Sequence, residues 1–325
     1  MSDAAAPSAP SSPVHRMFSL GRIAALAGNT LRDLIRQKVF YFMLVFALIL
    51  IGASLVLVSL SFQGEIQTLK DVGLGAISVF TMLLAVLSSA MLLPKDIEDR
   101  TLYTILAKPV TRFEYLLGKL SGVIAMLATA TVLMTACFCG VLLLWQGRAI
   151  DNIEMNYPVD MKAESVAAAT ASPDSTAPQT RRELEIQKLE SETFNGSLFG
   201  AIAILLLRAA VCAAVTLMVS CFATSWLFTV VAAFMMILIG HIVPIARDAW
   251  QAQAGMGGEL AIHIKLLLMG ITVFCPDMQL FNLVDDIAVG KIIPMEVFMQ
   301  TTALGFGYLA IYVFVGYLFF AWREL

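Results

Sequence analysis

The stretch Val39–Phe62 reads VFYFMLVFALILIGASLVLVSLSF and contains no charged residue. A helix needs about 20 consecutive apolar residues to cross the hydrocarbon core of a bilayer. This stretch is long enough, and its backbone can satisfy its own hydrogen bonds in lipid only as a helix. It therefore predicts an all-α integral membrane protein.

Further apolar runs follow along the chain and set the size of the predicted fold. Together with the first, they predict six transmembrane helices at 39–62, 73–93, 121–145, 197–222, 226–242 and 297–322, of which the fifth is the shortest. The composition agrees, because 59% of the residues are hydrophobic and 14% are charged, against about 25% charged in soluble domains.

The net charge and the cysteines exclude several classes of function. A net charge of −3 gives no general basic field, so we expect no nucleic-acid partner. All five cysteines lie in apolar segments or at their ends, which implies no disulfide framework. Cys137 and Cys139 point about 200° apart on a helix, with no His or acidic residue nearby, so we expect no metal site.

The N-terminal region divides into two parts. Residues 1–19 are rich in Ala, Ser and Pro and lack the pattern of a signal peptide, so they predict a disordered cytoplasmic tail. Residues 20–38 have apolar side chains at helical spacing with arginines between them, which predicts an amphipathic helix in the membrane interface. The alternative is that this segment is only the basic flank of the first span.

Orientation follows from the Lys and Arg residues near the span ends. With six spans, the basic residues on the side of the N-terminus are Arg16, Arg22, Arg32, Arg36, Lys38, Lys95, Arg100, Lys108, Arg112, Lys119 and Arg323. The short loop on the other side has only Lys70, and the long loop there carries little weight. We therefore expect both termini in the cytoplasm and a location in the inner (plasma) membrane.

Two segments are expected on the outer side. The loop 146–196 has too few bulky apolar residues for a core of its own, so it predicts a lid or stalk, flexible at first and ending in a short polar helix. The segment 260–293 is apolar but too short to cross twice. It is either re-entrant or a helix lying on the surface, with Pro276 as a break and Asp277 as a cap.

Residues that could carry chemistry are few. The sequence lacks a phosphate-binding glycine loop, a zinc-protease pattern and a serine-hydrolase pattern, so we expect no catalytic residue, no cofactor and no metal. Arg208 lies near the middle of the fourth predicted span, where a charge must face protein or water. Either it lines a translocation path and attracts an anionic or polar group, or backbone carbonyls or a subunit interface accommodate it.

The predicted cytoplasmic loop 94–120, PKDIEDRTLYTILAKPVTRFEYLLGKL, has the pattern of two helices around a break. In the first, Leu102, Ile105 and Leu106 form an apolar stripe. Acidic residues (Asp96, Glu98 and Asp99) stand around its start and Lys108 at its end, which suits the helix dipole.

Pro109 ends that helix, and Thr111 and Glu114 have the spacing of a capping box that opens the next one. The loop is thus expected to be rigid, with a stripe suited to docking in a partner's groove.

At these residues the chain resembles the membrane subunits of type-2 ATP-binding-cassette (ABC-2) exporters. The resemblance rests on the acidic Glu98 and Asp99, on Arg100-Thr101-Leu102, on Pro109-Val110-Thr111-Arg112 and on Leu116-Leu117-Gly118-Lys119. It extends to the interfacial helix, the six spans and the outer segment before the last span. The chain differs from many short members in its loop 146–196.

The resemblance implies that the loop is a coupling helix that docks on a separate ABC ATPase subunit, which binds the ATP. The coupling interface is then Glu98, Asp99, Arg100, Thr101, Leu102, Ile105 and Leu106. It also implies that two permease copies pair, as a homodimer or heterodimer, around a substrate path.

A non-transporting membrane anchor or sensor is the main alternative function. A secondary transporter is disfavoured, because the spans show neither paired ionisable groups nor an internal repeat.

Overall fold

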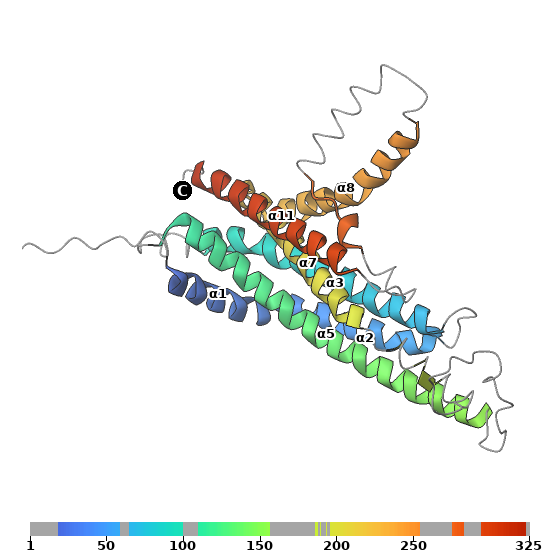
Figure 1. Ribbon diagram of the computed structural model, residues 1–325. Coiled ribbons are helices and arrows are strands. Elements are labelled where there is room, and N and C mark those ends of the chain that lie inside the picture. The colour runs from blue at the N-terminus through green and yellow to red at the C-terminus, as the bar shows by residue number, and fades with distance from the viewer. Residues whose placement is uncertain are drawn as a thin grey trace, which may run out of the picture.

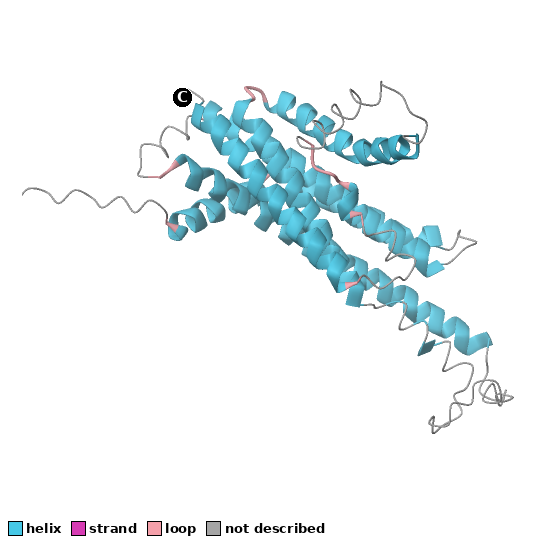
Figure 2. Ribbon diagram, turned by 45° about the horizontal axis from the view of Figure 1, so that its top comes forward, coloured by secondary structure: helices cyan, strands magenta, loops and turns pink. Residues whose placement is uncertain are grey.

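The computed structural model describes residues 19–58, 65–99, 110–156, 196–253, 275–282 and 294–322, together with residues 186, 187, 189 and 193. The long helices are α1 (Leu20–Ile35), α2 (Lys38–Val58), α3 (Glu65–Glu98), α5 (Arg112–Asn156), α7 (Gly196–Phe222), α8 (Trp226–Gln253) and α11 (Met295–Trp322). A short 3-10 turn, η3 (Gln279–Phe281), precedes α11. Across these residues the structure is helical and has no strand. Figures 1 and 2 show the helices as one elongated bundle.

Five helices (α2, α3, α5, α7 and α11) are long and apolar enough to cross a membrane, and Trp226–Ile242 within α8 is a shorter apolar helix. This confirms the prediction of an all-α chain with the composition of a multi-pass membrane protein.

The core of the bundle is built around α7, which packs against α3, α5, α8 and α11. Its sequence between Ala209 and Val215 is mostly Ala and Val, and every residue from Ala209 to Cys221 is buried. Small residues allow helices to approach closely in the absence of a hydrophobic force from water. By contrast, only 22% of the apolar window of α2 and 28% of that of α11 are buried inside the protein. Those two helices therefore expose wide apolar faces on the outside of the bundle.

Three helices are longer than the predicted spans, and one of them, α8, runs to Gln253, beyond the predicted end at residue 242. α3 runs from Glu65 to Glu98, beyond the predicted span 73–93 at both ends, so Lys70 lies buried in a helix and not in a loop. α5 runs from Arg112 to Asn156, beyond 121–145. Hydropathy marks the apolar part of a helix, whereas the helical hydrogen bonds continue into its polar ends.

The predicted loop boundaries change accordingly. Residues 94–98 are the last turn of α3 and residues 112–120 the first turns of α5, so the loop 94–120 is shorter than expected. Asp96 and Glu98 therefore belong to the end of α3, not to the start of a loop helix. Residues 146–156 continue α5 and do not begin the outer loop. Within the predicted polar helix of that loop, the described residues 186, 187, 189 and 193 are helical.

The predicted N-terminal amphipathic helix is present as α1, and the turn at Arg36–Gln37 separates it from α2. It packs along α5. A Cβ atom at Gly118 would lie 2.6 Å from Leu26 Cβ, and one at Gly122 would lie 2.6 Å from Thr30 Cβ and 2.9 Å from the Ala27 carbonyl oxygen. The two glycines therefore form the surface on which α1 rests. The predicted tail lies outside the described residues, except for Ser19.

Part of the predicted segment 260–293 is described, as residues 275–282. Asp277 Oδ1 accepts a hydrogen bond from the Gln279 N–H at 3.1 Å, next to the start of η3, while Met278 occupies the N-cap position itself. The Met278 N–H donates to the Gly240 carbonyl oxygen of α8 at 3.3 Å, and Met278 and Phe281 are completely buried. This turn is thus packed among the helices.

Candidate functional site

The predicted coupling residues fall on both sides of a boundary in the structure. Glu98 ends α3, Asp99 follows it, and both are exposed. The remaining predicted residues lie outside the described part of the chain: Arg100, Thr101, Leu102, Ile105 and Leu106. What the structure does describe is the segment that follows them, Arg112–Lys119, which we call the junction segment.

The predicted capping box, which joins Thr111 to Glu114 at the start of the junction segment, is confirmed by the structure. The Glu114 N–H donates to Thr111 Oγ1 at 3.2 Å, and the Thr111 N–H donates to Glu114 Oε2 at 3.0 Å. Two backbone N–H groups at the helix start are thus satisfied reciprocally. Side chains at the start of α5 therefore determine where this helix begins.

Glu114 also fixes the start of α1. The Ser19 N–H, at the N-cap of α1, donates to Glu114 Oε1 at 2.7 Å, and Arg22 Nη1 lies 3.3 Å from Glu114 Oε2. The Glu114 side chain is fully buried. One carboxylate therefore lies at the N-termini of two helices, where the helix dipoles favour negative charge.

Arg112 binds the opposite end of a third helix. Its Nη1 donates to the carbonyl oxygens of Phe320 and Ala321, both at 2.9 Å, in the last turn of α11. The guanidinium also lies over the Phe320 ring, 5.8 Å from its centroid. The last carbonyls of a helix lack partners within it and carry partial negative charge, so a cation there is favourable. Next to Arg112, the rings of Phe113 and Tyr317 meet edge to face.

Tyr115 and Lys119 join α5 to the end of α3. The Tyr115 hydroxyl donates to Asp96 Oδ2, and Lys119 Nζ lies 2.6 Å from the same oxygen. Lys119 also lies over the Tyr115 ring, 5.6 Å from its centroid, and Tyr115 stacks on Phe320 of α11 at 5.9 Å. The Asp96–Lys119 ion pair therefore joins the last turn of α3 to the first turns of α5.

The junction segment thus connects α5 to α1, α3 and α11 at one end of the bundle, where Figure 1 places the C-terminal end of α11. The capping box was predictable from the sequence, whereas the charges of this segment served there mainly to predict membrane orientation. The pattern R-F-E-Y-x-x-x-K at a helix start was a sequence signal for such interhelical contacts, because aromatic and charged residues share the first turns. Their partners come from other helices, so sequence spacing could not identify them.

Arg208, the predicted path residue, is half-buried on α7 and meets two neutral partners. Nη1 donates to Ser78 Oγ of α3 at 3.2 Å, and Nη2 lies 2.6 Å from His241 Nε2 of α8. His241 Nδ1 lies 2.9 Å from the carbonyl oxygen of Ile237. Because the arginine can only donate, Nε2 accepts and Nδ1–H donates, which makes this imidazole neutral.

The Arg208 charge therefore has no carboxylate partner among the residues that the structure describes. Its buried Nε atom also has no hydrogen-bond partner there. His241 and Arg208 belong to different helices, so the sequence pattern gave no sign that they meet. Together Ser78, Arg208 and His241 make a polar cluster between α3, α7 and α8.

Within the described part of the chain, no group of three or more His, Cys, Asp or Glu side chains is placed to hold a metal ion. All five cysteines are free.

No protein-family model matches the chain, and no curated protein is significantly similar to it.

Proposed function

We propose that the chain is the membrane-spanning permease subunit of an ATP-binding-cassette exporter. A separate cytoplasmic ATPase subunit binds and hydrolyses ATP, and the permease moves its substrate by alternating access. It is a transport subunit without enzymatic activity of its own. The junction segment is the observation that carries this proposal, supported by the resemblance of residues 98–119 to ABC-2 permeases.

A transport subunit driven by an external ATPase needs a contact loop that is rigidly joined to several helices. Residues 100–109 are followed directly by Arg112, Glu114, Tyr115 and Lys119, whose partners belong to α1, α3 and α11. A displacement of the loop is therefore passed to four helices through short polar contacts. A simple connector between two spans would not require such contacts.

We further propose six spans with both termini in the cytoplasm. Glu114 holds the start of α1 at the junction end, and Arg112 holds the end of α11 there. The rings of Phe222 and Phe319 lie 5.4 Å apart, which brings the end of α7 to the same end. Helix α8 starts directly after α7 and must run away from this end. These directions suit six crossings, with α8 as the fifth.

Arg208 supports transport over the alternative of a passive membrane anchor or sensor. A charge inside a membrane protein is costly and usually marks a pathway for ions or substrates. Ser78 and His241 are neutral, so the Arg208 charge stays available to attract an anionic or polar group. An anchor has no need of such a cluster between three helices.

A second permease copy completes the proposed transporter. The apolar faces of α2 and α11, which stay largely uncovered inside one chain, provide surface both for lipid and for this copy. Two copies then pair with two ATPase subunits around the substrate path.

The test is to substitute residues of the proposed docking stripe (Leu102, Ile105 and Leu106) while leaving the helices of the bundle unchanged. Leu102→Asp and Ile105→Asp are expected to abolish co-purification of the ATPase subunit while membrane insertion is unchanged. Leu184→Asp, in the outer loop, is the matched control and should retain the ATPase. Retention of the ATPase by both stripe variants would contradict the proposal.

A further inference from the structure

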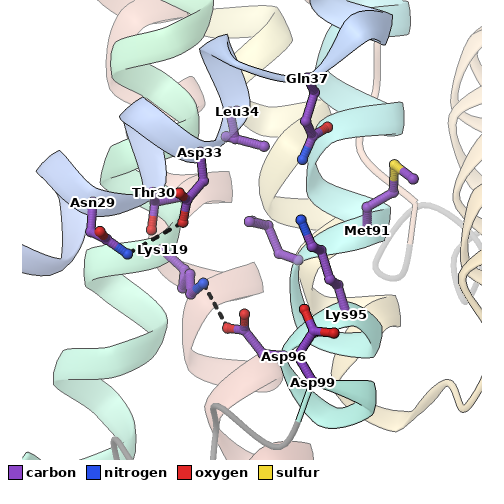
Figure 3. A pocket seen from close by; sticks show the side chains of 11 residues that line it. Asn29, Thr30, Asp33, Leu34, Gln37, Met91, Lys95, Asp96, Asp99 and Lys119 are labelled. Atoms are coloured by element: carbon purple, nitrogen blue, oxygen red, sulfur yellow. Dashed lines mark hydrogen bonds and ion pairs between the residues drawn. The ribbon is translucent and has the colours of Figure 1, made fainter.

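A cavity of about 300 Å³ lies between α1, α3 and α5, beside the junction segment. Figure 3 shows Thr30 and Asp33 on α1, Lys95 on α3 with Asp99 just after its end, and Lys119 on α5 around it. This volume is at the lower end of the range for small-ligand sites. Arg208 of α7 is not among the described residues that line the cavity.

The level of the cavity along the bundle indicates its environment. Gln37, which lines it, directly precedes the apolar helix α2. Lys95 follows the apolar part of α3, and Lys119 precedes that of α5. Three helices therefore change from charged to apolar at the height of the cavity, and its wall also includes Leu34 and Leu92. In a membrane protein this change marks the headgroup region of the bilayer.

A buried hydroxyl group in the wall lacks a partner. Thr30 is 1% exposed, and its Oγ1 has no hydrogen-bond partner in the described structure. Its side chain lines the cavity (Figure 3). Leaving a buried hydroxyl group unpaired is unfavourable, and a polar group bound in the cavity would satisfy it.

The charged groups that remain for a ligand are of both signs. Asp96 is already engaged by Lys119 and Tyr115. Asp33, Asp99 and Lys95 are exposed, and in the described part of the chain they form no ion pair. Asn29 Nδ2 donates to Asp33 Oδ2 at 3.3 Å, which orients that carboxylate. A ligand that carries one ammonium and one anionic group fits such a wall better than an ion of single sign.

We propose that this cavity binds a zwitterion with a primary ammonium and a phosphate, supplied as the headgroup of an aminophospholipid. The ammonium pairs with Asp33 or Asp99, the phosphate pairs with Lys95, and the Thr30 hydroxyl group bonds to the headgroup. The height of the cavity favours a lipid over a soluble zwitterion. The site goes beyond the proposed transport function, because it needs the membrane but not the ATPase subunit.

The experiment is native mass spectrometry of the full chain, purified in detergent and mixed with equal amounts of phosphatidylethanolamine and phosphatidylglycerol. The wild type is expected to retain phosphatidylethanolamine preferentially. Asp33→Asn and Thr30→Val should weaken its retention roughly tenfold. Asp151→Asn and Thr129→Val are the matched controls, since both residues are exposed on α5 away from the cavity, and they should bind as the wild type does.

Equal retention of the two lipids by the wild type would overturn the proposal. So would equal lipid retention by Asp33→Asn and Asp151→Asn. Free phosphoethanolamine is added in a separate arm. If it displaces the lipid at comparable concentration, the zwitterion site stands but its source is soluble, and the assignment to lipid is wrong. Asp33 is exposed, so thermal unfolding of its variant should match that of the wild type.

Discussion

At the scale of single residues, Glu114 has the most consequences for the fold. Its fully buried carboxylate accepts hydrogen bonds from backbone N–H groups at the starts of α1 and α5 and lies beside Arg22. Burying a charge is costly unless hydrogen bonds and an opposite charge surround it. Here all of these partners are present. The charge therefore contributes to stability only as long as both helices stay docked.

We predict that Glu114→Gln destabilises the chain by about 1–3 kcal/mol, because the amide keeps the shape but loses the charge-assisted hydrogen bonds. The measurement is thermal unfolding of the purified full chain. Glu296→Gln is the control, since Glu296 is also in the first turn of a helix but is exposed. Equal melting temperatures for the two variants would show that Glu114 does not hold the helices together.

Arg208 and His241 allow a second prediction at this scale. His241→Leu removes an acceptor from a charge that has Ser78 as its other partner, so it should cost about 1–3 kcal/mol. In an Arg208→Met background the same change should cost much less, because no buried charge is left unpaired. A double-mutant cycle on thermal unfolding measures this coupling. Additive effects of the two substitutions would contradict the contact.

At the scale of elements, the docking of α1 on α5 depends on two glycines. Gly122→Ala places a methyl group within 2.9 Å of the Ala27 carbonyl oxygen and 2.6 Å of Thr30 Cβ. We predict that it destabilises the chain by about 1–3 kcal/mol through overpacking and loosens α1, which hydrogen exchange would detect. Gly140→Ala is the control on the same helix, where nothing lies within 4 Å. It should be neutral or stabilising, because Ala favours the helix.

The elements also show what a sequence can and cannot specify. Apolar runs located the five long apolar helices and the shorter one at Trp226–Ile242, because hydrophobicity is a property of each segment by itself. The Thr111–Glu114 box was predictable for the same reason, since both partners lie within one turn. The contacts of Arg112 with α11 and of Arg208 with His241 join residues far apart in the chain, and local patterns do not encode them. The predicted helix ends were wrong where a helix continues into charged residues, as α3 does up to Glu98.

At the scale of the whole molecule, the contacts of the junction segment fix which chain ends lie together. Arg112 and Glu114 bring the start of α1, the start of α5 and the end of α11 to one end of the bundle. If the long helices cross the membrane, these points must share one side. The chain between α5 and α7 must then lie on the other side, because each of these helices crosses once.

We therefore predict that single cysteines at Ser8 and Thr104, introduced into a chain whose natural cysteines are replaced by serine, react with a membrane-impermeant maleimide only after the membrane is permeabilised. A cysteine at Ser172, in the outer loop, should react in intact cells. Labelling of Ser8→Cys and Ser172→Cys from the same side would rule out the six-span arrangement. If Thr104→Cys alone reacted with the maleimide in intact cells, residues 100–109 could not contact a cytoplasmic ATPase. That result would contradict the transport proposal but not the arrangement of the helices in the bundle.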